Sequence, residues 1–248
     1  MPQPLSKIRA RGTVSIGNSW DNPSDHRPEL ALLAMKVIAE WSILESFVTG
    51  LFVRMLGADP KPGAAMYAAL TGSAAQDAVF AALAKVTLPD SERDVFDAIV
   101  WLYKSAAKER NKIAHWVWGH AADIKDGVLL TDPDVLLEMR VATHEHEKKA
   151  QGWGKFVNAP KFPEDKIYVY YRDDFINTSK NIQNVLEYVT LFAFILNRGH
   201  PANANDGLFQ ELSVVPEIAE LLTRRASQRT SQAEQQSQPD QSPPTAKA

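Results

Sequence analysis

A long run of apolar side chains at helical spacing, from Pro28 to Leu56, constrains the fold of this chain more than any other feature. Its members are Leu30, Ala34, Val37, Ile38, Trp41, Leu44, Val48, Phe52 and Met55. Pro28 suits the first turn of a helix, and Gly57 is typical of the position directly after a helix end. Because most of the stability of such a helix comes from packing its apolar face, the rest of the chain must supply partners for it.

Further segments show the same periodicity. One is an alanine-rich stretch at residues 63–86. The next segment with apolar residues at helical spacing begins at Asp90 and continues to about Ile113. The letters DSERD at its start supply capping and acidic residues, which suit the positive end of a helix. Helical spacing returns over residues 173–197, and a last short helix is expected over residues 208–222. We therefore predict an all-α fold, an antiparallel bundle of four to five helices.

The remaining segments interrupt or flank this bundle. The runs HWVWGHA, VLL and IYVYY, with an Asp-Gly turn signal among them, predict a small β-hairpin or strand insertion at about residues 116–172. Residues 1–27 are predicted to be an irregular N-terminal arm, because prolines and glycines punctuate them without periodicity. Residues 225–248, rich in Ser, Gln and Pro, predict a disordered tail. One helical domain at residues 28–224 is the default for this length.

Composition excludes several classes of function. The formal net charge of −3 provides no global positive field, so any binding of nucleic acid must depend on a local patch. The absence of cysteine excludes disulfides, thiolate catalysis and zinc sites built on sulfur. The N-terminus lacks the apolar core of a signal peptide, and the longest strongly apolar run, residues 188–196, is too short to cross a bilayer. We expect a soluble, cytoplasmic protein without a membrane partner.

The third predicted helix carries a basic face with a histidine. At about 100° per residue, Asn111 and His115 share one face, and three lysines lie on it as candidate substrate-binding groups. These lysines are Lys104, Lys108 and Lys112. Arg110 falls instead at the margin of the apolar face. The helix thus presents cations to solvent and directs an arginine toward the bundle.

Glu45 is a complementary oddity, because it lies within the apolar stripe of the first helix, near Trp41 and Phe52. A carboxylate buried there without a partner would cost several kcal/mol or would become neutral. We predict that Arg110 is its structural partner, since nearly buried charges are usually paired. The alternative is that Glu45 reaches water at the edge of the bundle.

The stretch R-N-K-I-A-H, Arg110 to His115, resembles the R-N-x-x-x-H signature of the HEPN superfamily. These proteins are small helical bundles that occur in toxin–antitoxin systems, phage defence and RNA-guided RNA-cleaving effectors of bacteria. The resemblance covers about residues 28–197. It implies a metal-independent endoribonuclease without a cofactor, in which Arg and His from two copies of the motif face one another in a homodimer. RNA is the implied partner, with an antitoxin or regulatory protein as a second one.

These residue types suit that chemistry. RNA supplies its own nucleophile, the 2′-hydroxyl, so the protein needs a group that moves protons and a cation that stabilises the transition state. His115 can move the protons, because histidine changes charge near neutral pH. Arg110 can stabilise the phosphorane-like state, because its planar fork matches phosphate oxygens. Asn111 would orient the imidazole or a phosphate oxygen. The products would be a 2′,3′-cyclic phosphate and a 5′-hydroxyl.

Geometry and family variation leave a second interpretation open. Residues five apart on a helix diverge by about 140°, so Arg110 and His115 need a composite site across a dimer to face one ligand. One branch of the family carries a Tyr two residues after the His as a site of nucleotide transfer, and Val117 stands there in this chain. The alternative function is a non-catalytic HEPN-like module for dimerisation or for binding a ligand or protein.

A second histidine pair lies in the letters THEHEKK. On a strand, the alternation of His144 and His146 would place both on one side, where Glu145 or Glu147 could complete a metal site. A solvated charged loop is the favoured interpretation, because no third ligand follows at a recognisable spacing. Arg140 to His146 also repeats a loose Arg–His spacing, but in a polar region without a predicted helix.

Overall fold

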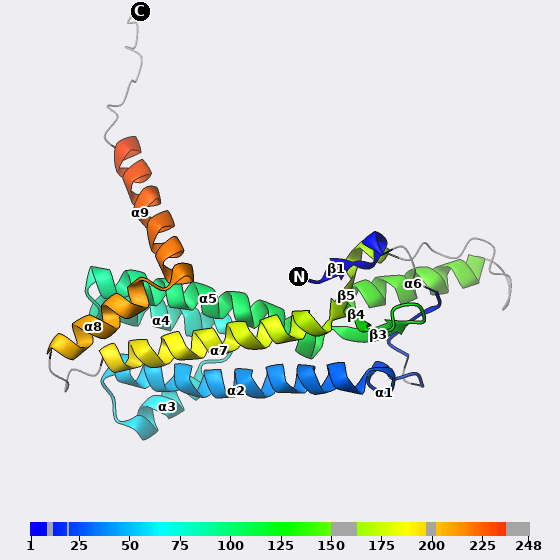
Figure 1. The fold of residues 1–248 in the computed structure, drawn as a ribbon, viewed down its shortest axis with the longest axis horizontal. Helices are drawn as coiled ribbons and strands as arrows, with labels where there is room; N and C mark the ends of the chain where they lie inside the picture. Colours follow the sequence, from blue (N-terminus) through cyan, green and yellow to red (C-terminus); the bar gives the residue numbers. More distant parts are fainter. Residues whose placement is uncertain (9–11, 19, 150–162, 197–201, 237–248) are drawn as a thin grey trace, which may run out of the picture. The chain divides into compact units, whose positions relative to one another are not determined.

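The computed structural model describes residues 1–8, 12–18, 20–149, 163–196 and 202–236. Within these ranges it has nine α-helices, two short 3-10 helices and one five-stranded antiparallel sheet (Figure 1). The predicted all-α bundle of four to five helices is therefore wrong. The chain divides into two compact units: Met1–Phe47 with Tyr103–Glu187, called the sheet unit, and Val48–Leu102 with Tyr188–Ala248, called the helical unit.

The sheet joins the predicted insertion to the N-terminus. Its strands are β1 (Gln3–Pro4), β2 (Val14–Ile16), β3 (Val117–Ala121), β4 (Gly127–Thr131) and β5 (Ile167–Tyr171). Their order is β1-β5-β4-β3-β2, so the first two strands form the two edges. The prediction of strands after the third long helix is confirmed. The prediction of an irregular N-terminal arm is wrong, because β1 pairs with β5 and β2 pairs with β3.

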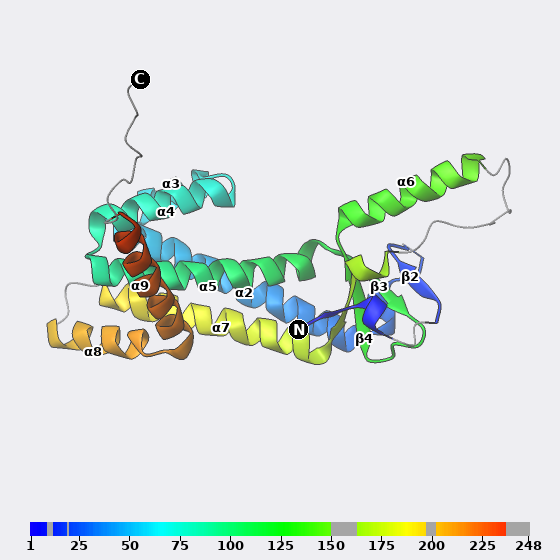
Figure 2. The ribbon, with the colours of Figure 1, turned by 90° about the horizontal axis from the view of Figure 1, so that it is seen from above.

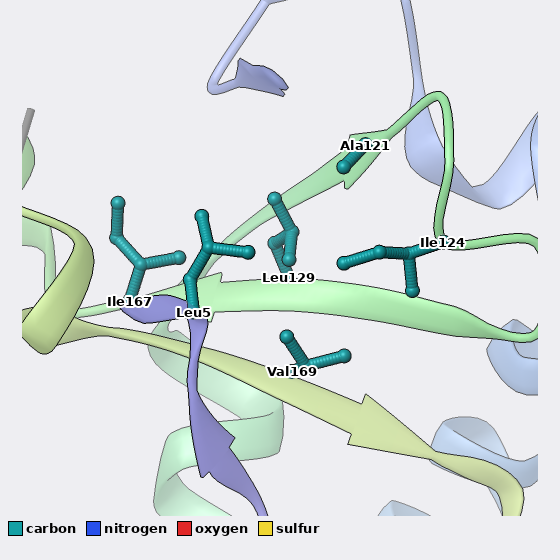
Figure 3. Packing of buried hydrophobic residues seen from close by; sticks show 6 residues of the cluster. All are labelled: Leu5, Ala121, Ile124, Leu129, Ile167 and Val169. Carbon is teal, nitrogen blue, oxygen red and sulfur yellow. The ribbon is translucent and has the colours of Figure 1, made fainter. Parts of the chain in front are cut away.

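The N-terminal residues also supply part of the sheet unit's core. Leu5 opens the 3-10 helix η1 (Leu5–Lys7) and is fully buried. It belongs to a cluster on one face of the sheet, shown in Figure 3. The other members are Ala121, Ile124, Leu129, Ile167 and Val169. An apolar side chain this deeply buried fixes the N-terminus on the sheet.

Three long helices contribute segments to both units. They are α2 (Pro28–Leu56), α5 (Asp90–His115) and α7 (Arg172–Ile195). The predicted bounds of α2 are confirmed: Pro28 is its first residue, and Gly57 follows it with φ +64°, a left-handed conformation typical after a helix end. The sheet unit also holds α1 (Pro23–His26), η2 (Glu164–Lys166) and α6 (Pro133–Lys149), which extends from the sheet as Figure 2 shows.

The direction of these helices differs from the predicted antiparallel arrangement. Within the sheet unit, α5 ends just before β3, whereas α7 begins just after β5. The start of α2 is also held at the sheet, because Arg27 donates a hydrogen bond of 3.0 Å to the carbonyl of Ile124. Thus α2 and α7 both run away from the sheet and α5 runs toward it. Ser179 of α7 donates a hydrogen bond to Glu40 of α2, which links the two parallel segments.

The helical unit contains α3 (Pro60–Ala69), α4 (Ser73–Thr87), α8 (Ala202–Ser213) and α9 (Pro216–Gln236). Its core includes ring contacts, with centroids 5.0 to 5.8 Å apart, between neighbours in the series Phe52, Tyr67, Phe80, Phe96 and Phe192. The predicted helix over residues 63–86 is two helices, because Gly72 has φ +89°. The one predicted over residues 208–222 is also two, since Pro216 cannot continue a helix and instead begins α9.

Helix α9 extends into the predicted disordered tail. Arg225 and Arg229 lie in it and bind two aspartates of α5: Arg225 Nη1 is 2.7 Å from Asp97 Oδ2, and Arg229 Nη2 is 2.6 Å from Asp94 Oδ1. The tail prediction is therefore wrong for residues 225–236, where ion pairs within the helical unit accompany the helix. The remainder of that prediction, residues 237–248, lies outside the described residues.

The apolar run at residues 188–196 falls at the end of α7. Across the described ranges, no helix combines the length and the apolar character needed to cross a membrane.

Candidate functional site

The last turns of α5 form an exposed face with the predicted histidine. Lys104, Lys108, Asn111 and His115 are all exposed, and their spacing of four, three and four residues keeps them on one side of the helix. We call these four residues the basic face of α5. Lys112 lies at its margin and is half-buried. The structure therefore brings together Lys104, Lys108, Asn111 and His115 as the sequence predicted, but it does not place Lys112 on the exposed face.

Lys112 makes local contacts. Its Nζ lies 2.7 Å from Glu109 Oε1, and it lies 5.6 Å from the centroid of the Trp116 ring. Both contacts hold the ammonium group beside its own helix. The exposed cations of the basic face are thus Lys104 and Lys108.

Arg110 lies on a different side of α5. It is half-buried, and its Cζ lies 5.6 Å from the centroid of the Trp41 ring, which in turn stacks on Tyr103 at 4.9 Å. Its Nη1 donates a hydrogen bond of 3.0 Å to Asn111 Oδ1. The buried Nε has no hydrogen-bond partner among the residues that the structure describes. Asn111 therefore touches the arginine and also belongs to the basic face.

The end of α5 is fixed where His115 sits. The Trp116 amide donates to the carbonyl of Lys112 at 3.0 Å, and the Trp118 indole donates to the carbonyl of Ile113 at 3.1 Å. β3 follows at once, at Val117. These bonds satisfy carbonyl groups that the end of a helix leaves without partners. His115 is thus presented from a rigid junction, as a site residue needs.

Glu45 is exposed, so the prediction of a nearly buried carboxylate at this position is wrong. The buried line of α2 passes through Trp41, Leu44 and Val48. Glu45 stands about 100° from Leu44 and reaches the surface. An exposed carboxylate remains solvated and does not need Arg110 as a partner, and Arg110 contacts Asn111 and Trp41.

Glu40, which the sequence did not single out, is the carboxylate that α2 directs into the sheet unit. It is 16% exposed and accepts hydrogen bonds from Ser179 Oγ at 2.5 Å and from Gln183 Nε2 at 2.6 Å. Lys36 Nζ lies 3.6 Å away. In the sequence, Lys36 and Glu40 are four residues apart and resemble an ordinary surface pair, so their spacing gave no signal of burial.

His144 and His146 lie on α6, not on a strand or loop. Side chains two residues apart on a helix point in nearly opposite directions, about 200° around the axis. The two histidines therefore cannot share a metal ion, as they could on a strand. Arg140 also lies on α6, contrary to the expectation of no helix there, and donates a hydrogen bond of 3.1 Å to the carbonyl of Gly17. In the pair Arg140 and His146, the arginine thus links α6 to the residue that follows β2.

A group of polar side chains that the sequence did not predict lies beside β3. Asp21 Oδ1 is 2.6 Å from His26 Nε2, and Asp21 Oδ2 is 3.4 Å from His120 Nε2. The hydrogen bond with His26 is the largest cause that holds the pKa of Asp21 below its usual range, with smaller contributions from Ser15 and from the charge of His120. Asp21 and His26 are close in the chain, but His120 is far from both, and the three match no ligand spacing, so no sequence signal indicated them.

This group predicts a change of stability with pH. The folded-state pKa of Asp21 is lowered, so its ionised form stabilises the fold above the pKa of the unfolded chain, and this contribution is lost as pH falls through the folded value. We expect Asp21→Asn to destabilise the protein at about pH 7 and to differ less from wild type below about pH 4. Urea unfolding midpoints at both pH values measure this. An equal difference at both would contradict it.

Comparison with known proteins gives no match: no family model fits this chain, and no curated protein or solved structure shows significant similarity. The function is therefore inferred from the residues of this chain.

Proposed function

We propose that this protein is a metal-independent endoribonuclease of the HEPN type, which acts as a homodimer in the bacterial cytoplasm as a toxin or phage-defence effector. The observation that carries the proposal is the basic face of α5, where exposed Lys104, Lys108 and His115 accompany an asparagine bonded to Arg110. On a chain of negative net charge, this face supplies the local cationic patch that RNA binding needs.

The reaction would proceed by internal transfer of the phosphodiester. His115 accepts the proton of the 2′-hydroxyl, whose oxygen attacks phosphorus, while the bond from phosphorus to the 5′-oxygen breaks and that oxygen takes up a proton from water. Arg110 stabilises the charge that develops on the phosphorane oxygens. Lys104 and Lys108 bind neighbouring phosphates. The products are a 2′,3′-cyclic phosphate and a 5′-hydroxyl, and no metal ion takes part.

A homodimer resolves the divergence of Arg110 and His115. The two residues stand about 140° apart on α5, and Asn111 bridges this angle, because it contacts Arg110 and lies one turn before His115. In a symmetric dimer, the arginine of one protomer can face the histidine of its partner, so that each of two sites uses both chains. Asn111 then holds the guanidinium fork toward the shared cleft.

Mixing two inactive variants tests this composite site. His115→Ala and Arg110→Gln should each be inactive, and the glutamine keeps a donor that can reach Asn111. After subunit exchange, about half of the dimers are mixed and each has one intact pair, so about a quarter of wild-type activity should return. RNA cleavage is measured before and after mixing. No recovery from variants that form normal dimers would contradict the composite site.

A second candidate function is a non-catalytic module that binds a protein or a ligand. The observation that favours it is the contact of half-buried Arg110 with Trp41, which is a structural role for the motif's arginine. Under this interpretation, Arg110→Gln should lower stability markedly, whereas His115→Ala should leave every binding property unchanged.

A further inference from the structure

Three side chains from two distant parts of the sequence converge beside β3. Asp21 follows β2, His26 is the last residue of α1, and His120 lies in β3. The imidazole centroids are 4.3 Å apart, with ring planes tilted by 31°. One carboxylate oxygen of Asp21 and one nitrogen from each histidine all lie within 4.8 Å of one another. Three donor atoms of two kinds thus lie close together.

The surrounding fold holds these side chains in place. The Asn22 side chain caps α1 by accepting a hydrogen bond of 3.1 Å from the Ser24 amide. Arg27, directly after His26, is bonded to the Ile124 carbonyl between β3 and β4. Ser15 pairs with His120 in the sheet register and is among the groups that lower the pKa of Asp21. Outer partners of this kind orient the groups that bind a metal ion.

His120 has fewer hydrogen bonds than a buried ring normally makes. Its side chain is 15% exposed, and its Nε2 has the Asp21 carboxylate at 3.4 Å. Its Nδ1 is buried and finds no hydrogen-bond partner within the described ranges. The contact of 3.4 Å between Nε2 and Asp21 is longer than an ordinary hydrogen bond. The nitrogen that faces the cluster is therefore available to a ligand.

We propose that Asp21, His26 and His120 bind a divalent first-row transition metal ion of the Zn²⁺ class. Two imidazole nitrogens with one carboxylate oxygen form a donor set that suits such ions, whereas Mg²⁺ and Ca²⁺ prefer oxygen ligands alone. Asp21 and His26 are 33% and 44% exposed, which leaves a solvent side for entry of the ion and for a water as fourth ligand. The proposed RNA cleavage uses none of these three residues.

The bound ion would take the place of protons in the cluster. Each nitrogen that binds it must be unprotonated, so binding releases protons and weakens as pH falls. The ion would join the segment of Asp21 and His26 to β3, contacts that exist only in the folded chain. It would therefore stabilise the fold by mass action and raise the melting temperature with its concentration. The role of the ion would thus be structural and independent of the basic face of α5.

Zinc titration of the untagged full-length protein tests the proposal, since a histidine tag would itself bind the metal. After treatment with EDTA and dialysis, the protein should bind one Zn²⁺ per chain in a calorimetric titration, and added Mg²⁺ or Ca²⁺ should not displace it. Loss of an outer-shell partner typically weakens a metal site about 10- to 100-fold, so Asp21→Asn and His120→Ala should each weaken zinc binding at least 100-fold. The increase of melting temperature with zinc should vanish in both variants.

His144→Ala is the matched control, because it removes an exposed histidine of α6 and should leave zinc binding unchanged. Should His120→Ala fail to fold, His26→Ala replaces it, since His26 is exposed. Wild-type protein that binds zinc no more tightly than Asp21→Asn would overturn the proposal, as would loss of binding in His144→Ala alone. Asp21→Asn should still cleave RNA in EDTA below its melting temperature, so the two proposals fail separately.

Discussion

His115→Ala should slow the cleavage of RNA by about 10²- to 10⁴-fold, the usual contribution of a group that transfers protons in the transition state. The side chain is exposed at the end of α5, so its removal leaves no cavity, and the helix end stays fixed by the bonds of Trp116 and Trp118. The assay uses a mixed RNA pool and excess EDTA. Wild-type products should carry 2′,3′-cyclic phosphates, which identify attack by the 2′-hydroxyl.

The controls separate a catalytic loss from other causes. Circular dichroism should show the same helix content and melting temperature for His115→Ala as for wild type. His144→Ala removes another exposed histidine of the sheet unit and should cleave at the wild-type rate. If wild type does not cleave, or if His115→Ala cleaves equally well, the endoribonuclease proposal is wrong and the binding module becomes the better interpretation.

Leu5→Ala should lower the free energy of unfolding by about 2–5 kcal/mol, the range for truncating a fully buried leucine. Leu5 is 0% exposed and packs with Leu129, Ile167 and Val169 under the sheet. A cavity there would stay largely unfilled, because side chains on paired strands cannot shift far into it. Chemical denaturation gives the difference directly from the midpoint and slope.

Leu137→Ala provides the comparison. This leucine lies on α6 and is 60% exposed, so its truncation should change stability by at most about 0.5 kcal/mol. Equal small effects of the two substitutions would mean that residues near the N-terminus do not belong to the core of the sheet unit, and that they pair only loosely with β5.

Helix periodicity was sufficient for the long helices and insufficient for the elements between them. The bounds of α2 followed from its stripe, Pro28 and Gly57, because those signals are local. The edge strands β1 and β2 have two and three residues, too few for an alternating pattern, and exist through pairing with β5 and β3. The far half of α9 is polar, and its ion pairs with Asp94 are tertiary contacts that no local pattern contains.

The candidate site divides in the same way. Lys104, Lys108, Asn111 and His115 could be placed on one face from spacing alone, since a helix fixes their angles. The carboxylate that turns inward from α2 is Glu40 and not Glu45. Its hydrogen-bond donors, Ser179 and Gln183, belong to α7, so the spacing within α2 could not indicate them. The Asp21–His26–His120 cluster depends on the register of β2 against β3, which sequence spacing does not encode.

The edge position of β1 has a consequence for how the protein is made. Gln3 pairs with Val169, so β1 leaves the ribosome long before its partner strand β5 exists. Contacts between residues so distant in the chain have a high entropic cost of loop closure and tend to form late. During synthesis, Leu5, which is buried in the folded core, therefore stays in an unfolded segment. When β5 has been made, it can pair with both β4 and β1, and β1 then joins the sheet.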